Sequence, residues 1–352
     1  MISFSSAGWG CDMRLALVGF GTVGQGVAEA VAMKKDFIFD RFGTDLKVVA
    51  AFDSMTYAMD PKGLKPLELV AKKQSGKGLG KTRPKSVAEM LRELDYDVLV
   101  EMTPTNIENA EPGYTNIRTA LECCRDVVTS NKGPLALKYR TLDELSKKNG
   151  VELRFEATVG GATPIINLSR ELLMAEKVES MKGILNGTCN FILSRMGEEG
   201  LPFEYVLKEA QEMGYAETDP SYDIDGIDSA CKLAILANAI MGQDVTYHDV
   251  RRTGIRRITQ EAVELAAKEK KVIRLIGEVN GGGVEVSPRM VPLGHPLSIS
   301  GTLNVLHMHT DLAGAITVTG RGAGRKETAS AIMSDLVGLL KRNACLLNGK
   351  VK

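Results

Sequence analysis

The sequence predicts an α/β protein of two domains, a doubly wound parallel sheet followed by an α+β domain with a mostly antiparallel sheet. Its 352 residues are too many for one ordinary core and suit two domains. The first half alternates short apolar runs with segments whose apolar residues recur at helical spacing, as in βαβ units. After Gly150, helical segments come first and alternating apolar runs follow, which indicates a second, antiparallel or mixed sheet.

The parallel sheet is predicted from compact apolar runs. They cover 13–19, 45–53, 97–103 and 126–130. Residues 22–35 carry apolar side chains at helical spacing and are predicted to form a helix. Residues 54–85 are rich in Gly, Lys and Pro, so we expect them to form an exposed excursion.

The second half has a different order of elements. Strands are predicted at 151–161, 178–186, 271–279, 283–291 and 304–319, and helices at 164–176, 188–197, 203–213 and 228–241. A Gly-rich turn and a last helix cover 320–342.

The composition is that of a soluble globular protein, with 44% apolar and 25% charged residues. Lys plus Arg and Asp plus Glu both number 44, so no net charge attracts nucleic acid or an acidic membrane. No apolar run reaches about 18 residues, and residues 1–12 look like a loose leader rather than a signal peptide. The six cysteines lack paired spacing, which favours reduced thiols in a cytoplasmic protein.

The first chemical motif is LALVGFGTVGQG (15–26). Gly19, Gly21 and Gly24 follow a predicted strand and open a predicted helix. Gly19 permits a tight turn, Gly21 lets the backbone approach a pyrophosphate, and Gly24 lets helix and strand pack closely. A Gly-rich packing turn is the alternative, but the strand and helix around this motif favour a Rossmann-type dinucleotide site.

Asp53, at the end of the second predicted strand, bears on the choice of nucleotide. An acid there bonds ribose hydroxyls and favours NAD, whereas the 2′-phosphate of NADP favours a basic residue. No basic residue follows Asp53 before Lys62. The lysines of 54–85 could fold back to supply one, so the predicted cofactor is NAD(P).

The second motif is GYAETDPSYDIDGIDSACK (214–232), five carboxylates followed by a lysine. A calcium loop starting at Ser221 would need a glutamate where Lys232 stands, which excludes that site. Asp228 and Lys232 share one helix face, and the residues that follow are apolar on all sides. A surface salt bridge is the alternative, but a lysine at the start of a buried helix needs a partner and can transfer a proton.

The spacing A-x3-G-Y-A-x2-D-P-x2-D-I-x-G-x-D-x3-K over 210–232 resembles the signature of homoserine dehydrogenase. GFGTVG (19–24), TSNKGPLA (129–136), FEATVGGATPII (155–166) and NGTCNFIL (186–193) are similar to other motifs of that family. TGRGAG (319–324) resembles its late Gly-rich turn, although Arg321 stands where proline is expected. The resemblance implies a short form without a C-terminal regulatory domain. It implies a dinucleotide domain over 13–155 completed by 320–352, and a substrate and dimerisation domain over 156–319.

The family reduces aspartate 4-semialdehyde to homoserine with NAD(P)H, for threonine, methionine and isoleucine biosynthesis. By this resemblance, Lys232 donates the proton, and Lys132 polarises the same oxygen or a bound water. The substrate ammonium would be held by Glu217 and Asp228, while Asp223 orients Lys232 or the loop. The resemblance also implies nucleotide contacts from Gly19, Phe20, Gly21, Thr22, Val23, Gly24, Asp53, Thr103, Lys132, Gly214 and Gly322.

The resemblance implies two further features, a sodium ion and a homodimer. The ion would be structural and bound by Glu156, Val159, Gly161 and Thr163, with an ordinary Gly-rich turn as the alternative. The dimer would form through the sheet of the substrate domain. His307 and His309 share a predicted strand face, but a structural pair is expected there rather than a metal site.

Two other functions compete with this interpretation. One is a dehydrogenase of the same architecture that acts on another small amino acid, such as an aspartate dehydrogenase. The other is a non-catalytic dinucleotide sensor, which the presence of both Lys132 and Lys232 disfavours. The motif over 210–232 disfavours the first, so the sequence predicts an enzyme with a small-molecule substrate and no nucleic-acid or membrane partner.

Overall fold

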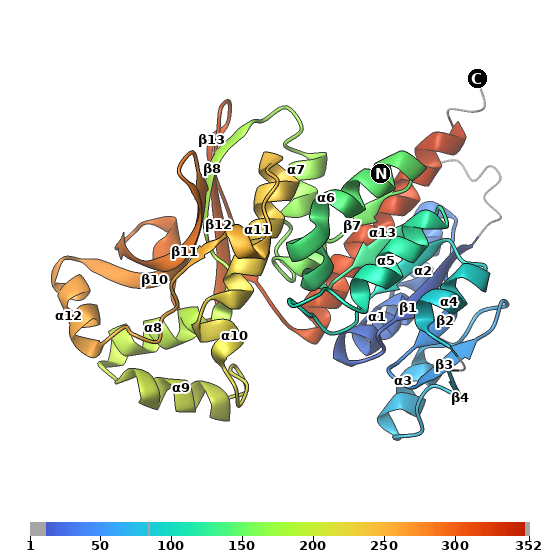
Figure 1. Ribbon diagram of the computed structural model, residues 1–352, viewed down its shortest axis with the longest axis horizontal. Helices are drawn as coiled ribbons and strands as arrows, with labels where there is room; N and C mark the ends of the chain where they lie inside the picture. Colours follow the sequence, from blue (N-terminus) through green and yellow to red (C-terminus); the bar gives the residue numbers. More distant parts are fainter. Residues whose placement is uncertain (1–11, 84, 349–352) are drawn as a thin grey trace. The chain divides into compact units, whose positions relative to one another are not determined.

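The computed structural model describes residues 12–83 and 85–348, with side chains described up to residue 342 (Figure 1). The expected leader therefore lies almost wholly outside the described residues. The chain forms two compact units. The first contains the residues up to 158 and those from 325 onward, and the second is the uninterrupted segment 159–324.

The first unit contains a seven-stranded sheet of order β4-β3-β2-β1-β5-β6-β7. Its strands are β1 (Met13–Val18), β2 (Leu46–Phe52), β3 (Thr56–Met59), β4 (Lys81–Thr82), β5 (Val98–Glu101), β6 (Asp126–Thr129) and β7 (Leu153–Arg154). β2, β1, β5, β6 and β7 are parallel neighbours, because helical crossovers return the chain to the same edge.

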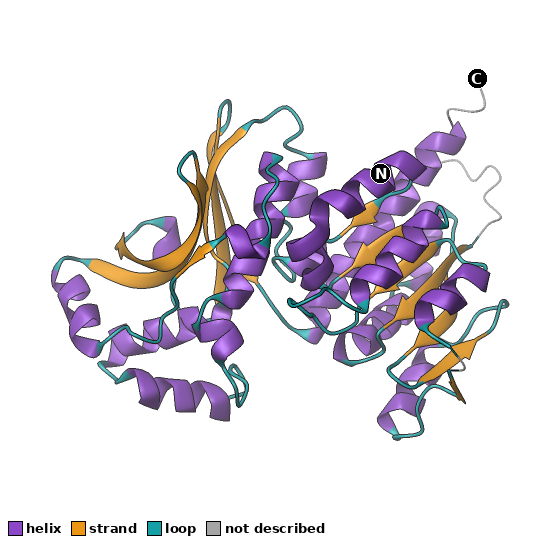
Figure 2. Cartoon of the chain, viewed as in Figure 1, coloured by secondary structure: helices purple, strands orange, loops and turns teal. Residues whose placement is uncertain are grey.

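Helices lie on both faces of this sheet (Figure 2). They are α1 (Thr22–Met33), α2 (Lys35–Phe42), α3 (Pro66–Gln74), α4 (Val87–Glu93), α5 (Gly113–Glu122), α6 (Lys132–Asn149) and α13 (Arg325–Asn348), with a 3₁₀ turn η1 (Glu156–Thr158). Side chains of α13 share a buried core with β1, β2, β5, α1 and α3. The last helix of the chain therefore completes the first unit.

The segment 54–85 differs from the expected exposed excursion. β3 pairs antiparallel with β2, and β4 pairs antiparallel with β3, so the segment widens the sheet by two strands. Leu69, Val70 and Leu79 are buried in the core of the first unit. Burial of these few apolar residues anchors the segment to the core. Its high content of Gly, Lys and Pro conceals the two strands from a reading of the sequence.

The second unit contains a six-stranded sheet of order β13-β12-β8-β10-β11-β9. Its strands are β8 (Val178–Ile184), β9 (Arg251–Arg252), β10 (Lys271–Asn280), β11 (Gly283–Pro292), β12 (Leu303–Thr310) and β13 (Gly314–Arg321). All pairs are antiparallel except that of β11 with β9. The alternating run predicted at 304–319 is a hairpin, β12 and β13.

The helices of the second unit accompany this sheet. They are α7 (Ile166–Glu171), α8 (Gly187–Glu199), α9 (Phe203–Glu212), α10 (Ser221–Ile224), α11 (Ile227–Met241) and α12 (Gln260–Lys268), with 3₁₀ turns η2 (Tyr247–Asp249) and η3 (Pro296–Ser298). Of the helix expected over 164–176, the structure contains only α7, which ends at Glu171. Leu172 and Met174 are 76% and 79% exposed, so no burial stabilises further turns.

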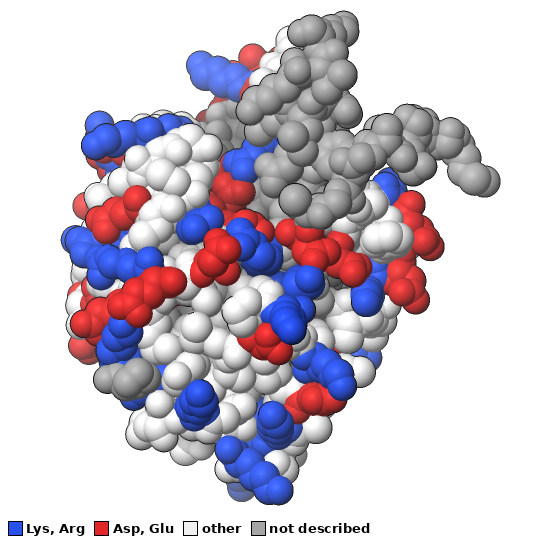
Figure 3. All heavy atoms as spheres, turned by 90° about the vertical axis from the view of Figure 1, so that its right-hand side faces the viewer, with Lys and Arg blue, Asp and Glu red and all other residues white. Residues whose placement is uncertain are grey.

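The predicted fold class is confirmed: a parallel-sheet unit is followed by a unit with a mostly antiparallel sheet. Within the described residues, no helix combines the length and the hydropathy needed to cross a membrane. On the face shown in Figure 3, acidic and basic side chains are interspersed. That face therefore presents no broad surface of one charge.

Candidate active site

The Gly-rich turn joins β1 to α1 in the first unit, as the sequence predicts. Gly19 has a φ of +94°, and a Cβ there would overlap the backbone of Met102. A Cβ on Gly24 would overlap the Gly19 carbonyl oxygen, whereas one on Gly21 would meet nothing within 4 Å. Phe20 is buried. The turn therefore leaves no room for a side chain at Gly19 or Gly24, whereas the space beside Gly21 is open.

The start of α1 has no side-chain cap and no acid in its first turn. Thr22 and Val23 begin this helix, so their backbone N–H groups lack helical acceptors. Thr22 is exposed and Val23 is half-buried. Unpaired N–H groups and the helix dipole attract an anion, so this turn fits a pyrophosphate.

Asp53 follows β2, and its carboxylate closes a tight turn. Oδ1 accepts hydrogen bonds from the N–H groups of Met55 (2.9 Å) and Thr56 (2.5 Å). Oδ2 accepts from Thr56 Oγ1 (2.9 Å) and from Lys73 Nζ (2.7 Å). Burial raises the pKa of the Asp53 carboxyl, but the hydrogen bonds it accepts, first of all from Lys73, outweigh this and lower the pKa to about 2.

A buried carboxylate connects the ends of β5 and β6. Glu101 is fully buried at the end of β5 and accepts hydrogen bonds from Thr103 N (3.1 Å), Thr103 Oγ1 and Thr129 Oγ1 (3.4 Å). Burial raises the pKa of Glu101 to about 7, although these hydrogen bonds oppose the rise. Asn131 Nδ2 donates to Thr103 Oγ1 (3.1 Å), and its Oδ1 caps α6 by accepting from Gly133 N (3.1 Å).

This network positions Lys132, which is the first residue of α6 and is half-buried. Two site residues that the sequence predicted, Thr103 and Lys132, are thus connected through Asn131. Glu101 and Asn131 were not predicted. An Asn just before a helix is a recognisable N-cap, but nothing in the sequence distinguishes Glu101 from the other carboxylates.

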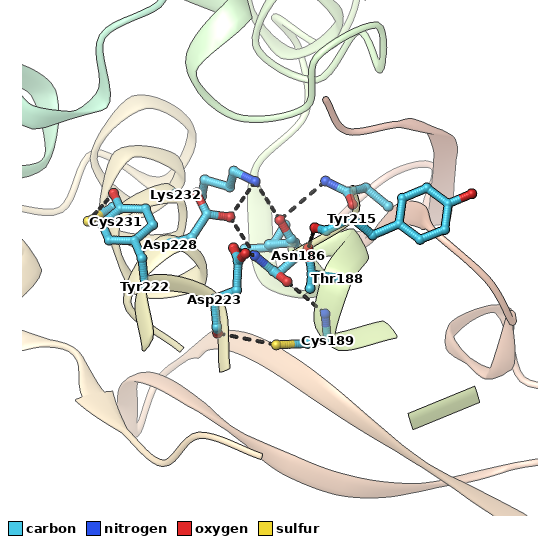
Figure 4. Close-up of polar contacts among 11 residues, drawn as sticks. Asn186, Thr188, Cys189, Tyr215, Tyr222, Asp223, Asp228, Cys231 and Lys232 are labelled. Carbon is cyan, nitrogen blue, oxygen red and sulfur yellow. Dashed lines mark hydrogen bonds and ion pairs between the residues drawn. The ribbon is translucent and has the colours of Figure 1, made fainter. Parts of the chain in front are cut away.

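Lys232 is the central residue of the second unit's polar cluster (Figure 4). It lies on α11, and its Nζ is 2.7 Å from Asp228 Oδ2 and donates to the Leu185 carbonyl oxygen at 2.6 Å. Both side chains of the ion pair are more than nine-tenths buried, at 9% and 8% exposure. The apolar residues after Lys232 are buried as well. The predicted buried lysine with a carboxylate partner is therefore present, and the exposed salt bridge is not.

Asn186 binds the two acids of this cluster (Figure 4). Its Nδ2 donates to Asp223 Oδ1 at 2.6 Å and to Asp228 Oδ2 at 3.0 Å. Its Oδ1 accepts from Cys189 N at 2.8 Å and so caps α8. Asn304 Nδ2 donates to the Leu185 carbonyl at 3.2 Å, which therefore accepts from Asn304 and from Lys232. Asn186 and Asn304, which are far apart in the sequence, therefore both bind groups that hold the side chains of α11.

Glu217 and Gly214 lie apart from this buried cluster on the loop between α9 and α10. The side chain of Glu217 is exposed, and its carbonyl accepts from Gln211 Nε2 at 3.1 Å. Gly214 has a φ of +75°, which only glycine adopts readily. The structure thus brings together Asp223, Asp228 and Lys232, but leaves Glu217 on the surface.

The loop over 159–163 packs on the late Gly-rich turn. Ala162 N donates to the Arg321 carbonyl at 3.0 Å, and a Cβ on Gly161 would overlap the backbone of Gly322. Val159 is buried, and the buried Thr163 Oγ1 has no hydrogen-bond partner among the described residues. Glu156 belongs to the first unit, where its N–H donates to Asp335 Oδ2 at 2.9 Å.

The described residues contain no group of three or more His, Cys, Asp or Glu placed to hold a metal ion. His307 and His309 lie on β12 with ring centroids 6.2 Å apart, and His307 Nδ1 bonds Thr317 Oγ1 at 2.8 Å. Cys123, Cys124 and Cys189 are free thiols. Burial raises the pKa of the Cys189 thiol well above its usual range, and the negative charges of Asp223 and Asp228 raise it further. This thiol is therefore not a nucleophile at neutral pH.

The geometry of the second unit suits proton transfer to an oxygen. An ammonium group that is desolvated and held by one carboxylate and one carbonyl stabilises negative charge that develops nearby. The turn of the first unit suits a dinucleotide. Together these features are those of a dehydrogenase.

Comparisons with known proteins agree with this chemistry. The homoserine dehydrogenase family profile matches residues 164–337, and the profile of the NAD-binding domain of homoserine dehydrogenase matches residues 19–156. A homoserine dehydrogenase of Methanocaldococcus jannaschii is 49% identical over 92% of this chain and 98% of its own length. An NAD(+)-dependent homoserine dehydrogenase of Pseudomonas canavaninivorans is 37% identical over 93% and 96%.

Solved structures give the same result. A chain from Archaeoglobus fulgidus, provisionally assigned as a homoserine dehydrogenase, has a TM-score of 0.87 at 48% identity over 93% of this chain and 99% of its own. A hyperthermophilic archaeal homoserine dehydrogenase solved in complex with NADPH has a TM-score of 0.81 at 30% identity over 93% and 97%. The chain therefore belongs to the homoserine dehydrogenase family of NAD(P)-dependent oxidoreductases.

Proposed function

We propose that this protein interconverts L-aspartate 4-semialdehyde and L-homoserine, with Lys232 as the proton donor during reduction. Bound NAD(P)H supplies a hydride to the aldehyde carbon, and the oxygen gains a proton. The observation that carries the proposal is the buried Lys232 ammonium between the Asp228 carboxylate and the Leu185 carbonyl. A lysine fixed in this way can give up its proton to an alkoxide and regain it from solvent.

The acids around Lys232 suit an amino-acid substrate. We assign Glu217 and Asp228 to the substrate ammonium, because carboxylates anchor a fixed positive charge. The exposed Glu217 is accessible to a ligand from solvent. Asp223 is assigned to positioning, since Asn186 connects it to the carboxylate that holds Lys232. Lys132, at the N-terminus of α6, is assigned to polarising the substrate oxygen.

The first unit is proposed to bind the nucleotide through the Gly-rich turn, Thr103 and Lys132. The uncapped start of α1 supports the pyrophosphate position. The domain limits expected from the sequence, 13–155 with 320–352 and 156–319, correspond in this proposal to the two compact units.

A structural sodium ion is proposed at the loop formed by Glu156, Val159, Gly161 and Thr163. The unpartnered buried hydroxyl of Thr163 supports an additional ligand there, and hard cations prefer such oxygens. Thermal unfolding in NaCl and in choline chloride tests this. A melting temperature that is the same in both salts contradicts the site.

We also propose a cytoplasmic homodimer that serves threonine, methionine and isoleucine synthesis. The dimer follows from the family resemblance of the sequence, and its proposed interface is the sheet of the second unit. Light scattering on the purified protein tests the dimer, and a monomer mass contradicts it. Neither a non-catalytic dinucleotide sensor nor a dehydrogenase of another small amino acid is favoured, because the relatives at 49% and 37% identity are homoserine dehydrogenases.

The deciding experiment measures homoserine-dependent reduction of NAD and of NADP by wild-type protein, Lys232→Ala and Lys208→Ala. Loss of a general acid lowers kcat by roughly 10²- to 10⁴-fold. Lys208 lies on α9 in an exposed pair with Glu212, so Lys208→Ala controls for loss of a lysine. A wild-type protein that binds a nucleotide but oxidises no homoserine contradicts the function. Activity of Lys232→Ala above a tenth of wild type contradicts the role of Lys232.

A further inference from the structure

Glu101, the last residue of β5, is a buried acid without a cationic partner. Its side chain is inaccessible to solvent, and among the described residues no lysine, arginine or histidine forms an ion pair with it. It is held by hydrogen bonds from Thr103 N (3.1 Å), Thr103 Oγ1 and Thr129 Oγ1 (3.4 Å). Burying a carboxylate without a counter-charge costs stability. Residues that cost stability concentrate at functional sites, so the place of Glu101 in the fold is informative.

Glu101 lies between the two strands that lead into the nucleotide site. It is paired with Val18 at the end of β1 and with Thr129 at the end of β6. β1 leads into the Gly-rich turn, and a Cβ on Gly19 would lie 2.6 Å from Thr103 N. Ligands of open parallel sheets bind at these carboxyl ends of the strands. The Gly-rich turn belongs to the first mononucleotide-binding half of such a sheet, so the ends of β5 and β6 belong to the second, which receives the nicotinamide.

A directed chain of hydrogen bonds runs from Asn131 to Glu101. An ionised carboxylate only accepts hydrogen bonds, so the Thr103 hydroxyl must donate to it. The lone pairs of that hydroxyl then accept from Asn131 Nδ2 at 3.1 Å. This leaves Asn131 Oδ1 to accept from Gly133 N at 3.1 Å, which caps α6. Glu101 therefore fixes which end of the Asn131 amide faces the helix that begins at Lys132.

A second link between Glu101 and Asn131 runs through Thr129. The hydrogen of Thr129 Oγ1 is shared between the Glu101 carbonyl (3.0 Å) and the Glu101 carboxylate (3.4 Å). The same oxygen accepts from Asn131 N at 3.0 Å. Thr129 and Asn131 are both buried, so water does not compete for these bonds. The backbone and the side chain of Asn131 are thus both connected to Glu101.

We propose that Glu101 is a positioning residue for the nicotinamide half of the nucleotide site. As an acceptor that cannot donate, it directs the Thr103 hydroxyl and the Asn131 amide. The cap made by Asn131 then fixes the start of α6 and, with it, Lys132. This inference rests on the proposed function, in which Thr103 and Lys132 contact the nucleotide. It adds a residue that acts only through these two.

The test compares nucleotides with and without the nicotinamide ring. ADP-ribose is NADH with a hydroxyl in place of that ring, and 2′-phospho-ADP-ribose stands in the same relation to NADPH. Calorimetric titration of the pair that wild type binds more tightly isolates the contribution of the ring, and no substrate is present. The titrations are run at about pH 8.5, above the pKa of about 7 to which burial raises Glu101, so that its carboxylate is ionised.

Four variants complete the design. Glu101→Gln keeps the size of the side chain but adds a donor, so it no longer directs the chain of hydrogen bonds. Thr103→Val removes the linking hydroxyl, whereas Thr103→Ser keeps it. Asp126→Asn is the matched control, because Asp126 is a buried acid at the opposite end of the neighbouring strand β6. There it accepts from Glu152 N at 2.8 Å, away from the nucleotide edge.

Glu101→Gln and Thr103→Val should each bind the reduced nucleotide roughly 3- to 10-fold more weakly than wild type, which corresponds to about one hydrogen bond. Both variants should bind the ring-less ligand within about twofold of wild type. Thr103→Ser and Asp126→Asn should bind both ligands within about twofold of wild type. The melting temperature of Glu101→Gln should not fall, since this change removes a buried charge.

Two results overturn the proposal. One is an unchanged affinity of Glu101→Gln for the reduced nucleotide. The other is an equal loss of affinity for both ligands, with or without a lower melting temperature, because that assigns Glu101 a general structural role. An enzyme that binds these ligands as expected but oxidises no homoserine contradicts the proposed reaction and leaves the role of Glu101 in place.

Discussion

Replacing Asp228 by asparagine is expected to destabilise the second unit strongly, because it leaves a buried ammonium without its counter-charge. The change keeps the size of the side chain, so no cavity forms. Asp228 Oδ2 accepts from both Lys232 Nζ (2.7 Å) and Asn186 Nδ2 (3.0 Å). An amide can direct its oxygen toward these donors but carries no charge.

The magnitude follows from the burial of the pair. Removing one partner of a buried ion pair costs about 3–5 kcal/mol, and both side chains here are less than a tenth exposed. The amide oxygen keeps a hydrogen bond, which offsets about 1 kcal/mol. The free energy of unfolding of the second unit should therefore fall by about 2–4 kcal/mol.

The assay must report on the second unit alone, because the chain has two compact units that can unfold separately. Native-state hydrogen exchange of the α11 amides gives the opening free energy of this helix. Asp225→Asn is the matched control, since its pair with Arg256 is 39% and 50% exposed. That substitution should change the opening free energy by about 1 kcal/mol or less.

A double variant completes the design. Lys232→Met in the Asp228→Asn background removes the stranded ammonium and should recover about 2 kcal/mol or more of the lost stability, because an apolar pair of similar volume is tolerated where an ion pair was buried. The reasoning is refuted if Asp228→Asn lies within about 0.5 kcal/mol of wild type. It is refuted equally if adding Lys232→Met destabilises the protein further.

Three further predictions concern the first unit. Gly19→Ala should lower its unfolding free energy by about 1–3 kcal/mol or more, because of its positive φ and its contact with Met102. Gly21→Ala should stay within about 1 kcal/mol in urea unfolding, and equal effects of the two would contradict the turn geometry. The pKa of Glu101 is about 7 in the folded protein, against an ordinary value of 4.5. Its contribution to stability is therefore fully present below about pH 4.5 and is lost as the pH rises through 7. Glu101→Gln should flatten the decline in stability from pH 5 to pH 8, on the order of 1–3 kcal/mol, and an unchanged slope would assign the decline to other groups. Asn131→Ala removes the cap of α6 and should cost about 1–2 kcal/mol and raise the KM for nucleotide, whereas an unchanged KM would separate this cap from the site.

The parallel sheet and the Gly-rich turn were predictable from the sequence because their signals are local. Each buried strand is a compact apolar run, and Gly19 and Gly24 must be glycine for steric reasons within a few residues. The helix expected over 164–176 failed for the opposite reason. Its apolar residues recur at helical spacing, but Leu172 and Met174 are exposed, and spacing alone does not reveal burial.

The parts of the site that escaped prediction depend on contacts between distant positions. Asn186 bonds acids 37 and 42 residues away, and Lys73 pairs with a carboxylate 20 residues away. One lysine among many in a Lys-rich segment carries no local signal that distinguishes it. Glu101 was missed similarly, since its complete burial follows from the packing of β5 between β1 and β6.

The place of α13 in the first unit has a consequence for synthesis on the ribosome. This helix contributes Ala329, Ile332, Met333, Leu336, Leu339 and Leu340 to a core that begins with Met13. The nascent chain emerges from its N-terminus, so the second unit, 159–324, is complete before α13 has been translated. Until then, the apolar surfaces of β1 and α1 that α13 covers stay open to water and to chaperones. Of these two units, the one whose translation begins first is therefore the last to finish folding.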